Sequence, residues 1–291
     1  MNYFDIAASS IENFSMDEAE YTLLDRRTNI VVHGLDGKVF LKQSTINSAD
    51  PAIPSSPSLY GFIRGGFRKL FAAIAQLQRY LGKPRRWPGG AKIKIYFGKT
   101  KGCKVFIGEN IRGDMTINFR GNDSIIYIGS QCYLNKLEIR SLQDNDFIAI
   151  GNGVTTTNRN VWISGNGAGN ETPAIIIGDD CMFSYDVVVR NSDAHPIFDA
   201  ETDDQINEPT GIVHIEPHVW ICEQVNILKS TTIGACSIIA LGSVVTKDVP
   251  RFSIASGVPA ISRTNENTYW ARSDGAKKEK AKEYYQKYKN L

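Results

Sequence analysis

Residues 212–249 read IVHIEPHVWICEQVNILKSTTIGACSIIALGSVVTKDV and carry a branched aliphatic residue at every sixth position. A period of six fits neither the helical period of about 3.6 residues nor the simple alternation of a β-strand. It is typical of a β-solenoid in which each flat side is one hexapeptide long. The aliphatic series is Ile215, Ile221, Ile227, Ile233, Ile239 and Val245, and the fourth residue after each is Val219, Val225, Thr231, Ser237, Ser243 and Val249.

A less regular repeat extends the pattern upstream. Isoleucine followed by glycine recurs between short β-rich runs such as KVFIG, SIIYIG and FIAIG, which are separated by turn sequences such as GNDS and QDND. We therefore predict an all-β fold in which residues 91–263 form a parallel β-helix. The repeated pairs are Ile107-Gly108, Ile128-Gly129, Ile150-Gly151, Ile177-Gly178 and Ile233-Gly234.

Residues 1–90 do not share this rhythm, and we treat them as an N-terminal extension. Residues 29–42 place β-formers on both sides of Asp36-Gly37, which predicts a hairpin. After a Pro- and Ser-rich linker, apolar residues recur at helical spacing over 63–81. Residues 51–91 contain seven basic residues and no acidic one, so residues 60–86 are either a helix docked on protein or a basic amphipathic helix on an anionic membrane surface.

The C-terminal tail, residues 264–291, is polar and rich in lysine. Gly275 separates two helix-compatible pieces, so we predict a solvated C-terminal helix. The sequence therefore predicts three parts: the N-terminal extension, the β-helix and this helical tail.

Composition excludes several classes of protein. The 33 Lys and Arg residues nearly balance the 31 Asp and Glu residues, so bulk charge gives no reason to expect nucleic-acid binding. The sequence shows no signal peptide and no apolar stretch long enough to span a membrane. Its five cysteines lack C-x-x-C spacing, which favours reduced thiols and a cytoplasmic protein, peripheral to the inner membrane face if residues 60–86 bind lipid.

The hexapeptide runs ending in IIALGSVVTKDVPRFSIASGVPA, preceded by HVWICEQVNILKSTTIG and by the His195-Pro196 step, resemble the left-handed β-helix acyltransferases that use acetyl-CoA. Within that superfamily they resemble sugar O-acetyltransferases of the galactoside and maltose type and of capsule and O-antigen biosynthesis. The likeness is good over 175–263, covers 92–174 as degenerate coils, and does not reach residues 1–90. It implies a homotrimer with acetyl-CoA between neighbouring β-helices and no metal.

The stretch RNSDAHPIFD, residues 190–199, interrupts the repeat, and the six-residue period resumes only at Ile215. The simplest interpretation is a long loop leaving one coil, and loops of that length in compact domains are usually functional. Transfer of an acetyl group to a hydroxyl needs a base, and a neutral imidazole suits that task. The resemblance places the catalytic base at the His of a His-Pro step, which is His195.

Three residues near His195 and one on a later coil are further candidates. Asp193 lies two residues before His195, and it either orients the imidazole or binds the acceptor sugar. Arg190 and Asn191 are candidate acceptor contacts. Trp220 holds the V-W-I position that the resemblance places at the active-site wall, although a corner tryptophan packed on a neighbouring subunit is the alternative.

The resemblance also indicates where acetyl-CoA binds. Thr246 and Lys247 match the V-T-K element that meets the cofactor, and backbone amides near Gly242 and Ser243 are expected to pair with the pantetheine arm. The sequence departs from the family at Leu241, Glu223 and Ile261, where small, Ser or Gly, and basic residues are common. Arg263 or Arg251 is then expected to contact the nucleotide end.

The implied mechanism is direct transfer, in which His195 takes the acceptor proton and the hydroxyl oxygen attacks the thioester. Cys181 and Cys222 lie near the site in the chain, but we interpret them as small hydrophobic residues. Three alternatives stay open: an N-acetyltransferase acting on an amino sugar, a non-catalytic scaffold, and a γ-carbonic-anhydrase-like zinc enzyme. The last would use His195, His214 and His218.

Overall fold

The computed structural model describes residues 2–23, 30–34, 36–42, 91–165, 173–208 and 210–291. Residues 1–47 and 90–291 belong to one compact unit. The predicted linker and the predicted basic helix over 60–86 lie outside the described residues. Among the helices of the described segments, none combines the length and the apolar character that crossing a bilayer requires.

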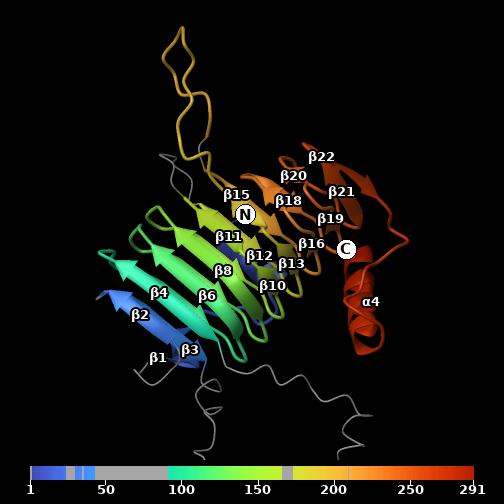
Figure 1. Cartoon of the computed structure of the whole chain (residues 1–291), viewed down its shortest axis with the longest axis horizontal. Helices are drawn as coiled ribbons and strands as arrows, with labels where there is room; N and C mark the ends of the chain where they lie inside the picture. Colours follow the sequence, from blue (N-terminus) through green and yellow to red (C-terminus); the bar gives the residue numbers. More distant parts are fainter. Residues whose placement is uncertain (1, 24–29, 35, 43–90, 166–172, 209) are drawn as a thin grey trace, which may run out of the picture. The chain divides into compact units, whose positions relative to one another are not determined.

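One side of the β-helix, side A, is an eight-stranded sheet, parallel from its second strand onward, with β1 antiparallel to β3 at its edge (Figure 1). The chain returns to side A once per coil, so each strand pairs with the equivalent strand of the next coil. The strands, in order, are β1 (Tyr21–Leu23), β3 (Lys38–Lys42), β5 (Lys104–Ile107), β7 (Ile125–Ile128), β9 (Phe147–Ile150), β12 (Ala174–Ile177), β15 (Ile212–Ile215) and β18 (Thr231–Ile233).

The opposite wall is a fourteen-stranded sheet that changes form along the β-helix. Its first coils contribute long strands: β2 (Ile30–Gly34), β4 (Lys92–Gly98), β6 (Arg112–Phe119) and β8 (Tyr133–Ser141). After β8 each coil divides into two short strands, because both β10 and β11 pair with different halves of β8. Side B then contains β10 (Thr155–Asn158), β13 (Met182–Tyr185), β16 (Trp220–Ile221), β19 (Ile238–Ile239) and β21 (Ser253–Gly257), with β22 (Ala260–Thr264) antiparallel to it; side C contains β11 (Asn160–Ser164), β14 (Val188–Arg190), β17 (Asn226–Ile227) and β20 (Val244–Val245).

The six-residue period is confirmed as a property of three flat sides. Three successive members of the series fall on sides A, B and C, and the next three repeat the order one coil later. Ile215 pairs with Ile233, Ile221 with Ile239, and Ile227 with Val245, and every side chain in the series is fully buried. Burying such a side chain contributes roughly 1.5–3 kcal/mol to the stability of the fold. The buried side chains of the series therefore hold each coil on the next.

The Ile-Gly pairs mark the end of side A, where the chain turns. A Cβ atom added to Gly108 would stand 2.7 Å from the backbone of Gly129, and Gly129 and Gly151 have the same relation to the next glycine, Gly151 and Gly178. The glycines therefore stack at a close approach of backbone to backbone that leaves no room for a side chain. This stack explains why the pair recurs on the successive coils from Gly108 to Gly178.

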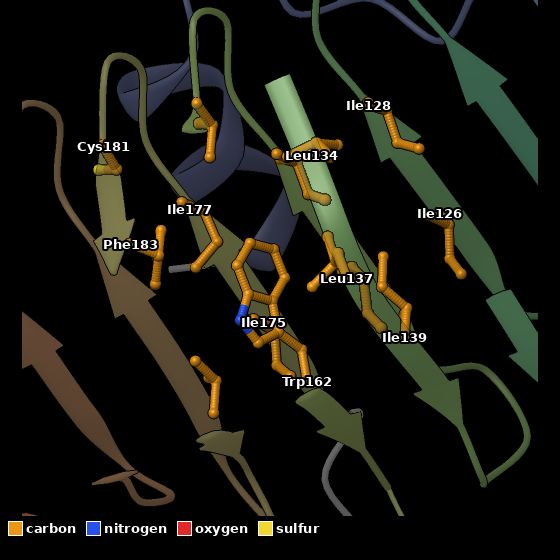
Figure 2. Close-up of a cluster of buried hydrophobic side chains, with 14 of the residues drawn as sticks. Ile126, Ile128, Leu134, Leu137, Ile139, Trp162, Ile175, Ile177, Cys181 and Phe183 are labelled. Atoms are coloured by element: carbon orange, nitrogen blue, oxygen red, sulfur yellow. The ribbon is translucent and has the colours of Figure 1, made fainter. Parts of the chain in front are cut away.

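The interior of the coils is filled by side chains from all sides (Figure 2). Trp162 is its largest fully buried side chain, and its ring lies 4.9 Å from that of Phe183 on the next coil. Around this pair Figure 2 shows Ile175 and Ile177 of side A facing Leu137 and Ile139 of the opposite wall. The β-helix is thus a packed core without a channel.

The predicted hairpin over residues 29–42 is wrong. β2 pairs in parallel with β4 of the opposite wall, and β3 pairs in parallel with β5 of side A. Asp36 and Gly37 therefore lie between two strands of different walls, because β-formers around a turn dipeptide also describe one coil of a solenoid. The described β-helix begins with these strands, earlier than the predicted start at residue 91.

The N-terminal segment covers the outer face of side A. Helix α1 (Tyr3–Ser10) begins with a capping box between Asn2 and Asp5, and the 3-10 helix η1 (Glu18–Glu20) follows. Aromatic and aliphatic residues from this segment pack on outward-facing side chains of side A, which explains why side A is apolar on both faces. The buried outer cluster is Ala7, Ile11, Tyr21, Phe40, Phe106, Tyr127, Phe147, Ala149, Ala174 and Ile176.

The C-terminal helix α4 (Ala276–Lys289) confirms the predicted helix but not its solvation. Its Ala281 and Tyr288 are buried, and Tyr288 packs with Phe252 and Cys236 at the turn between sides A and B. We call this turn, residues 179–180, 217–218, 235–236 and 251–252, the helix corner. We call the turn between sides C and A, residues 142–146, 164–165, 190–208 and 210–211, the loop corner.

Candidate active site

A long loop leaves the loop corner between β14 and β15 and leads away from the strands (Figure 1). It is an antiparallel ribbon, because Ser192 bridges Thr210 at its base and Phe198 bridges Gln205 near its tip. The predicted break in the repeat is therefore a real projection. Three large apolar side chains on it are more than half exposed, Ile197, Phe198 and Ile206, which is unusual for a surface loop.

His195 lies in the first strand of this ribbon, and it is exposed. Its backbone carbonyl accepts a hydrogen bond from Asn207 Nδ2 at 3.2 Å, which joins it to the returning strand. An exposed imidazole on an anchored backbone can reach a substrate that approaches from solvent. The role of His195 as the catalytic base stays a prediction.

The Asp193 carboxylate turns to other partners than the His195 ring. Its Oδ2 lies 2.7 Å from Lys229 Nζ and accepts from Asn207 Nδ2 at 2.9 Å. Burial raises the pKa of Asp193, but the bonds from Lys229 and Asn207 outweigh it, so the pKa lies below its usual value. In this arrangement Asp193 holds the base of the loop through Lys229 and Asn207, and its two alternative roles, orienting His195 or binding the acceptor, stay predictions.

Asn191 and Arg190 flank the start of the loop. Asn191 is fully buried, donating from Nδ2 to Ser164 Oγ at 3.0 Å and accepting at Oδ1 from the Gly165 amide at 2.9 Å. The predicted acceptor contact of Asn191 is therefore wrong, because both ends of its side-chain amide are bonded inside the protein. Arg190 is partly exposed, and its Nε donates to the Ser192 carbonyl.

A buried carboxylate missed by sequence reasoning supports Asn191. Ser164 Oγ donates to Asp146 Oδ1 at 3.2 Å, and Asp146 Oδ2 accepts from the Gln143 amide. Burial raises the pKa of Asp146 to about 6, although these hydrogen bonds act in the opposite direction. Asp146, Ser164 and Asn191 come from three coils, so no spacing in the sequence could have linked them.

Trp220 begins β16 and is partly exposed on side B. Its ring lies 5.9 Å from that of Trp270, at an angle of 46°, and Trp270 is itself buried. The contact comes from the C-terminal tail, whose position on side B no sequence pattern predicted. The role of Trp220 at the active-site wall stays a prediction.

The predicted cofactor residues fall on neighbouring turns of the last coils. Thr246 and Lys247 are exposed after β20. Gly242 has a positive φ of 70° at the turn between sides B and C, and Ser243 is buried. The backbone amide of Gly242 donates to the Glu223 carbonyl, and that of Ser243 donates to the Ala240 carbonyl. These two amides are therefore already engaged and do not offer free donors to pantetheine.

The two candidate arginines differ sharply. Arg251 forms a bidentate ion pair with Glu216, through Nε at 2.7 Å and Nη2 at 2.8 Å. Its guanidinium also lies over the Tyr288 ring. Arg263 is exposed on β22, beside the cis peptide bond Val258-Pro259 of the same hairpin. Arg263 is therefore the better placed of the two for a phosphate, because Arg251 is engaged in structural contacts.

The three histidines of the zinc alternative do not converge. His214 Nε2 contacts Ser10 Oγ of α1 at 2.7 Å, and burial lowers the pKa of His214. His218 contacts Asp180 and Trp270 at the helix corner, whereas His195 is on the projecting loop. Within the described part of the chain no group of three or more His, Cys, Asp or Glu is arranged to hold a metal ion.

The cysteines near the site have no partner that would activate them. Cys181 is fully buried, and burial raises its pKa; burial also raises the pKa of the partly exposed Cys222. Both thiols are therefore kept in the protonated, weakly nucleophilic form. Their interpretation as small hydrophobic residues agrees with these surroundings.

Known proteins similar to this chain share its fold and are named as acetyltransferases. A polysialic acid O-acetyltransferase of Escherichia coli O1:K1 / APEC is 39% identical over 102 residues, 35% of this chain and 33% of the relative. One of Neisseria meningitidis is 30% identical over 140 residues, 48% of this chain and 57% of the relative. The chain thus spans between a third and three fifths of the length of these curated relatives, and no family model matches it.

The crystal structure of the polySia-specific acetyltransferase NeuO matches with a TM-score of 0.60 and 29% identity, covering 68% of this chain and 90% of that one. The fold is therefore the left-handed β-helix of the hexapeptide-repeat acyltransferases, and the resemblance stated from the sequence is confirmed. Over these parts of its length the chain is similar to polysialic acid O-acetyltransferases.

Proposed function

We propose that this protein is an acetyl-CoA-dependent O-acetyltransferase that acts on a hydroxyl of an acidic polysaccharide of the polysialic acid type. The observation that carries the proposal is His195, an exposed imidazole on an anchored loop of a left-handed β-helix related to enzymes named for that activity. We further propose that the enzyme works in the cytoplasm, as a homotrimer in which the loop meets a neighbouring subunit.

In the proposed reaction, His195 removes the proton from the acceptor hydroxyl as its oxygen attacks the thioester carbonyl carbon. The C–O bond forms, and the negative charge on the carbonyl oxygen is stabilised by hydrogen-bond donors around the site. Collapse of the tetrahedral intermediate breaks the C–S bond, and the imidazolium returns its proton to the CoA thiolate. No acyl-enzyme is formed, in keeping with the raised pKa values of Cys181 and Cys222.

The loop tip restricts how an acidic polymer can approach. It carries five carboxylates (Asp199, Glu201, Asp203, Asp204 and Glu208), and these would repel a polyanion. Arg190 and Lys229 lie at the base of the loop instead. We therefore propose that the polymer approaches His195 from the base, with Arg190 as the acceptor contact, and that acetyl-CoA uses Thr246, Lys247 and Arg263.

The test is an acceptor panel with isotopically labelled acetyl-CoA. Polysialic acid, monomeric sialic acid, a galactoside and an amino sugar are compared, and the labelled product is then treated with mild base. The proposal predicts base-labile label on polysialic acid. Base-stable label on the amino sugar would favour the N-acetyltransferase alternative, and absence of label on every acceptor would favour a scaffold.

A further inference from the structure

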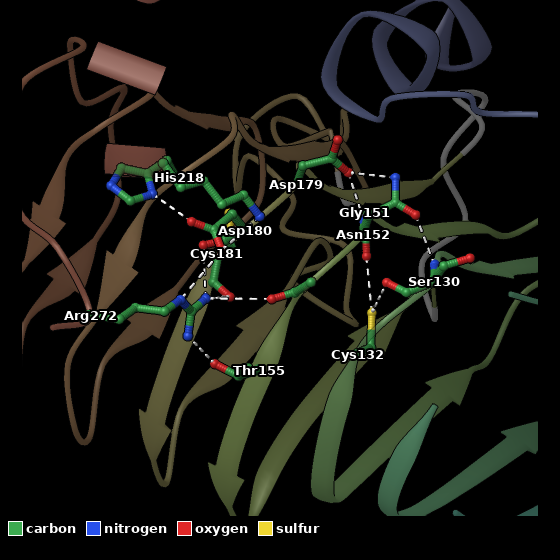
Figure 3. Close-up of polar contacts among 12 residues, drawn as sticks. Ser130, Cys132, Gly151, Asn152, Thr155, Asp179, Asp180, Cys181, His218 and Arg272 are labelled. Carbon is green, nitrogen blue, oxygen red and sulfur yellow. Dashed lines mark hydrogen bonds and ion pairs between the residues drawn. The ribbon is translucent and has the colours of Figure 1, made fainter. Parts of the chain in front are cut away.

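His218 is a buried histidine, and Figure 3 shows its contact with Asp180. It occupies the helix corner with a positive φ of 59°, and only 1% of it is exposed. Its Nδ1 lies 2.8 Å from Asp180 Oδ2, and its Nε2 lies 3.0 Å from the backbone carbonyl oxygen of Trp270. The ring therefore bridges the β-helix to the C-terminal segment.

Both partners of the ring can only accept hydrogen bonds. Burial raises the pKa of Asp180, but the bonds and charges of His218, Arg272 and Lys280 outweigh it and keep the pKa below its usual value, so Asp180 is a carboxylate. A backbone carbonyl has no proton to donate. Each ring nitrogen must therefore carry a proton, and the ring that fits this site is an imidazolium.

The aromatic neighbours suit a cationic ring. Trp270 stacks on one face of His218 with ring centroids 4.1 Å apart, and Tyr284 of α4 stacks at 5.1 Å; both pairs are within 6° of parallel. Faces of aromatic rings attract cations through their quadrupole. Trp270 Nε1 also donates to the His218 carbonyl at 3.0 Å, so Trp270 and His218 are joined by two hydrogen bonds and a stack.

Two further cations surround Asp180. Arg272 Nε lies 3.4 Å and Lys280 Nζ 3.5 Å from its Oδ1. Arg272 also donates to the carbonyls of Asp180 and Cys181. The other titratable groups near the ring are Tyr284 on α4 and, on adjacent coils, Asp179, the Cys181 and Cys236 thiols, and Glu216, which is paired with Arg251.

The stack reaches Trp220, a predicted active-site residue, because the Trp270 ring lies 5.9 Å from the Trp220 ring. We propose that His218, as a buried imidazolium, is a positioning residue that holds Trp270 against Trp220 and so couples docking of the C-terminal segment to acetyl transfer. Loss of the ring proton removes the Trp270 hydrogen bond and loosens the segment. The link to acetyl transfer rests on the proposed function, whereas the charge of the ring does not.

The first test uses the full-length chain without substrate. Nitrogen NMR of histidine-labelled protein distinguishes a ring with two protonated nitrogens from a neutral tautomer, and fluorine NMR of the fluorotryptophan-labelled chain reports on Trp220 and Trp270. We expect both His218 nitrogens to carry protons in the folded chain, because each faces an acceptor. We also expect the Trp220 and Trp270 signals to shift together when His218 is replaced by Gln. A neutral His218 in the folded chain, or a Trp220 signal that does not respond to His218→Gln, would overturn the proposal.

The second test compares His218→Gln with His214→Gln. His214 is also buried, but it faces the Ser10 hydroxyl, which can donate or accept and so accommodates a neutral ring. We expect His218→Gln to lower kcat about tenfold with little change in the KM for acetyl-CoA, and to move the Trp220 signal. His214→Gln should leave both unchanged. Equal effects of the two changes would contradict a positioning role.

A third variant, Trp270→Phe, tests the same contact if His218→Gln does not fold. Trp270→Phe keeps the backbone acceptor and an aromatic face, but removes the Nε1 donor and shortens the ring that meets Trp220. We expect a folded chain with a protonated His218, a shifted Trp220 signal and a reduced kcat. An unaltered Trp220 signal would show that Trp270 does not position it. If no acceptor is acetylated, the NMR results still decide the charge and the coupling.

Discussion

Asp146 at the loop corner and Asp180 at the helix corner are both buried carboxylates, and their pKa values are shifted in opposite directions. At the loop corner Asp146 meets only neutral donors, and burial raises its pKa to about 6. At the helix corner Asp180 is nearly as buried, but His218, Arg272 and Lys280 surround it and lower its pKa. The comparison shows that the partners, more than the depth of burial, decide which form of a buried acid the fold stabilises.

The difference matches what each corner holds in place. The loop corner fixes the start of the projecting loop through a chain of short polar side chains, ending at Asn191. The helix corner fixes the C-terminal segment through charge and stacked rings. A chain of neutral hydrogen bonds therefore supports the start of the projecting loop, beside the Lys229–Asp193 ion pair, whereas ionic contacts and stacked rings support the segment that packs behind Trp220.

The largest effect on stability is expected at the helix corner. Asp180→Asn leaves three buried or half-buried cations without their carboxylate, which should lower the free energy of unfolding by about 3–5 kcal/mol. Denaturant unfolding followed by circular dichroism measures this loss. Asp274→Asn is the matched control, because Asp274 is 95% exposed and its loss should change little. Equal behaviour of the two variants would mean that the ionic contacts do not hold the corner.

Replacing Asp146 should have the opposite effect on the free energy of unfolding near neutral pH, which we expect to rise. Its folded-state pKa of about 6 lies above the ordinary value of 3.8, so the folded state keeps the proton to higher pH than the unfolded state does. Stability from this group is full below about pH 4 and is lost as pH rises to about 6, a change on the order of 3 kcal/mol. Asp146→Asn should remove that slope and be more stable than wild type near neutral pH.

Thermal unfolding at several pH values measures the Asp146 slope. A variant that is as pH-sensitive as wild type, or less stable near neutral pH, would show that Asp146 is not the neutral acid that its contacts indicate. Asp144→Asn is a suitable control, since Asp144 is an exposed neighbour that accepts from Asn122.

The two arginines separate structure from cofactor binding. Arg251→Ala strands Glu216 and should cost about 1–3 kcal/mol of stability, with a modest change in the KM for acetyl-CoA. Arg263→Ala should leave stability unchanged and raise that KM severalfold. The KM for acetyl-CoA and the free energy of unfolding, measured on the same preparations of the two variants, distinguish a structural role from cofactor binding. The reverse pattern would assign the nucleotide end to Arg251.

The smallest effect on unfolding is expected on the loop. Replacing Ile197, Phe198 and Ile206 by Ser should change the unfolding free energy of one chain by less than about 0.5 kcal/mol, because all three are exposed. If the loop meets a neighbouring subunit, light scattering should show a weakened trimer. An unchanged trimer would place these side chains away from the subunit contact.

The parts of the fold with a strict local period were predictable. Ile215 to Val245 gave the three-sided coil, and the isolated His-Pro step in a broken repeat gave the loop. The turn dipeptide Asp36-Gly37 led to the wrong prediction of a hairpin, because a hairpin and one coil of a solenoid have similar sequence patterns over these fourteen residues. The spacing of Ala281, Tyr284 and Tyr288 indicated a buried helix face that the lysines obscured.

The contacts that fix the site could not be predicted from one sequence. Asp146, Ser164 and Asn191 meet because successive coils stack, and coil lengths vary where the period is degenerate. Likewise Trp270 reaches His218 from 52 residues away. Pairings of this kind follow from three-dimensional register, whereas sequence reasoning sees only local spacing.

The most direct measurement of the central claim is kcat/KM for acetyl transfer to polysialic acid by His195→Ala and by His33→Ala. His33 is also an exposed histidine, stacked on Tyr96 in the first described coil. If His195 is the base, its removal should lower kcat/KM about 10²–10⁴-fold with unchanged thermal stability, while His33→Ala retains full activity. Wild-type kcat/KM in His195→Ala would contradict the account.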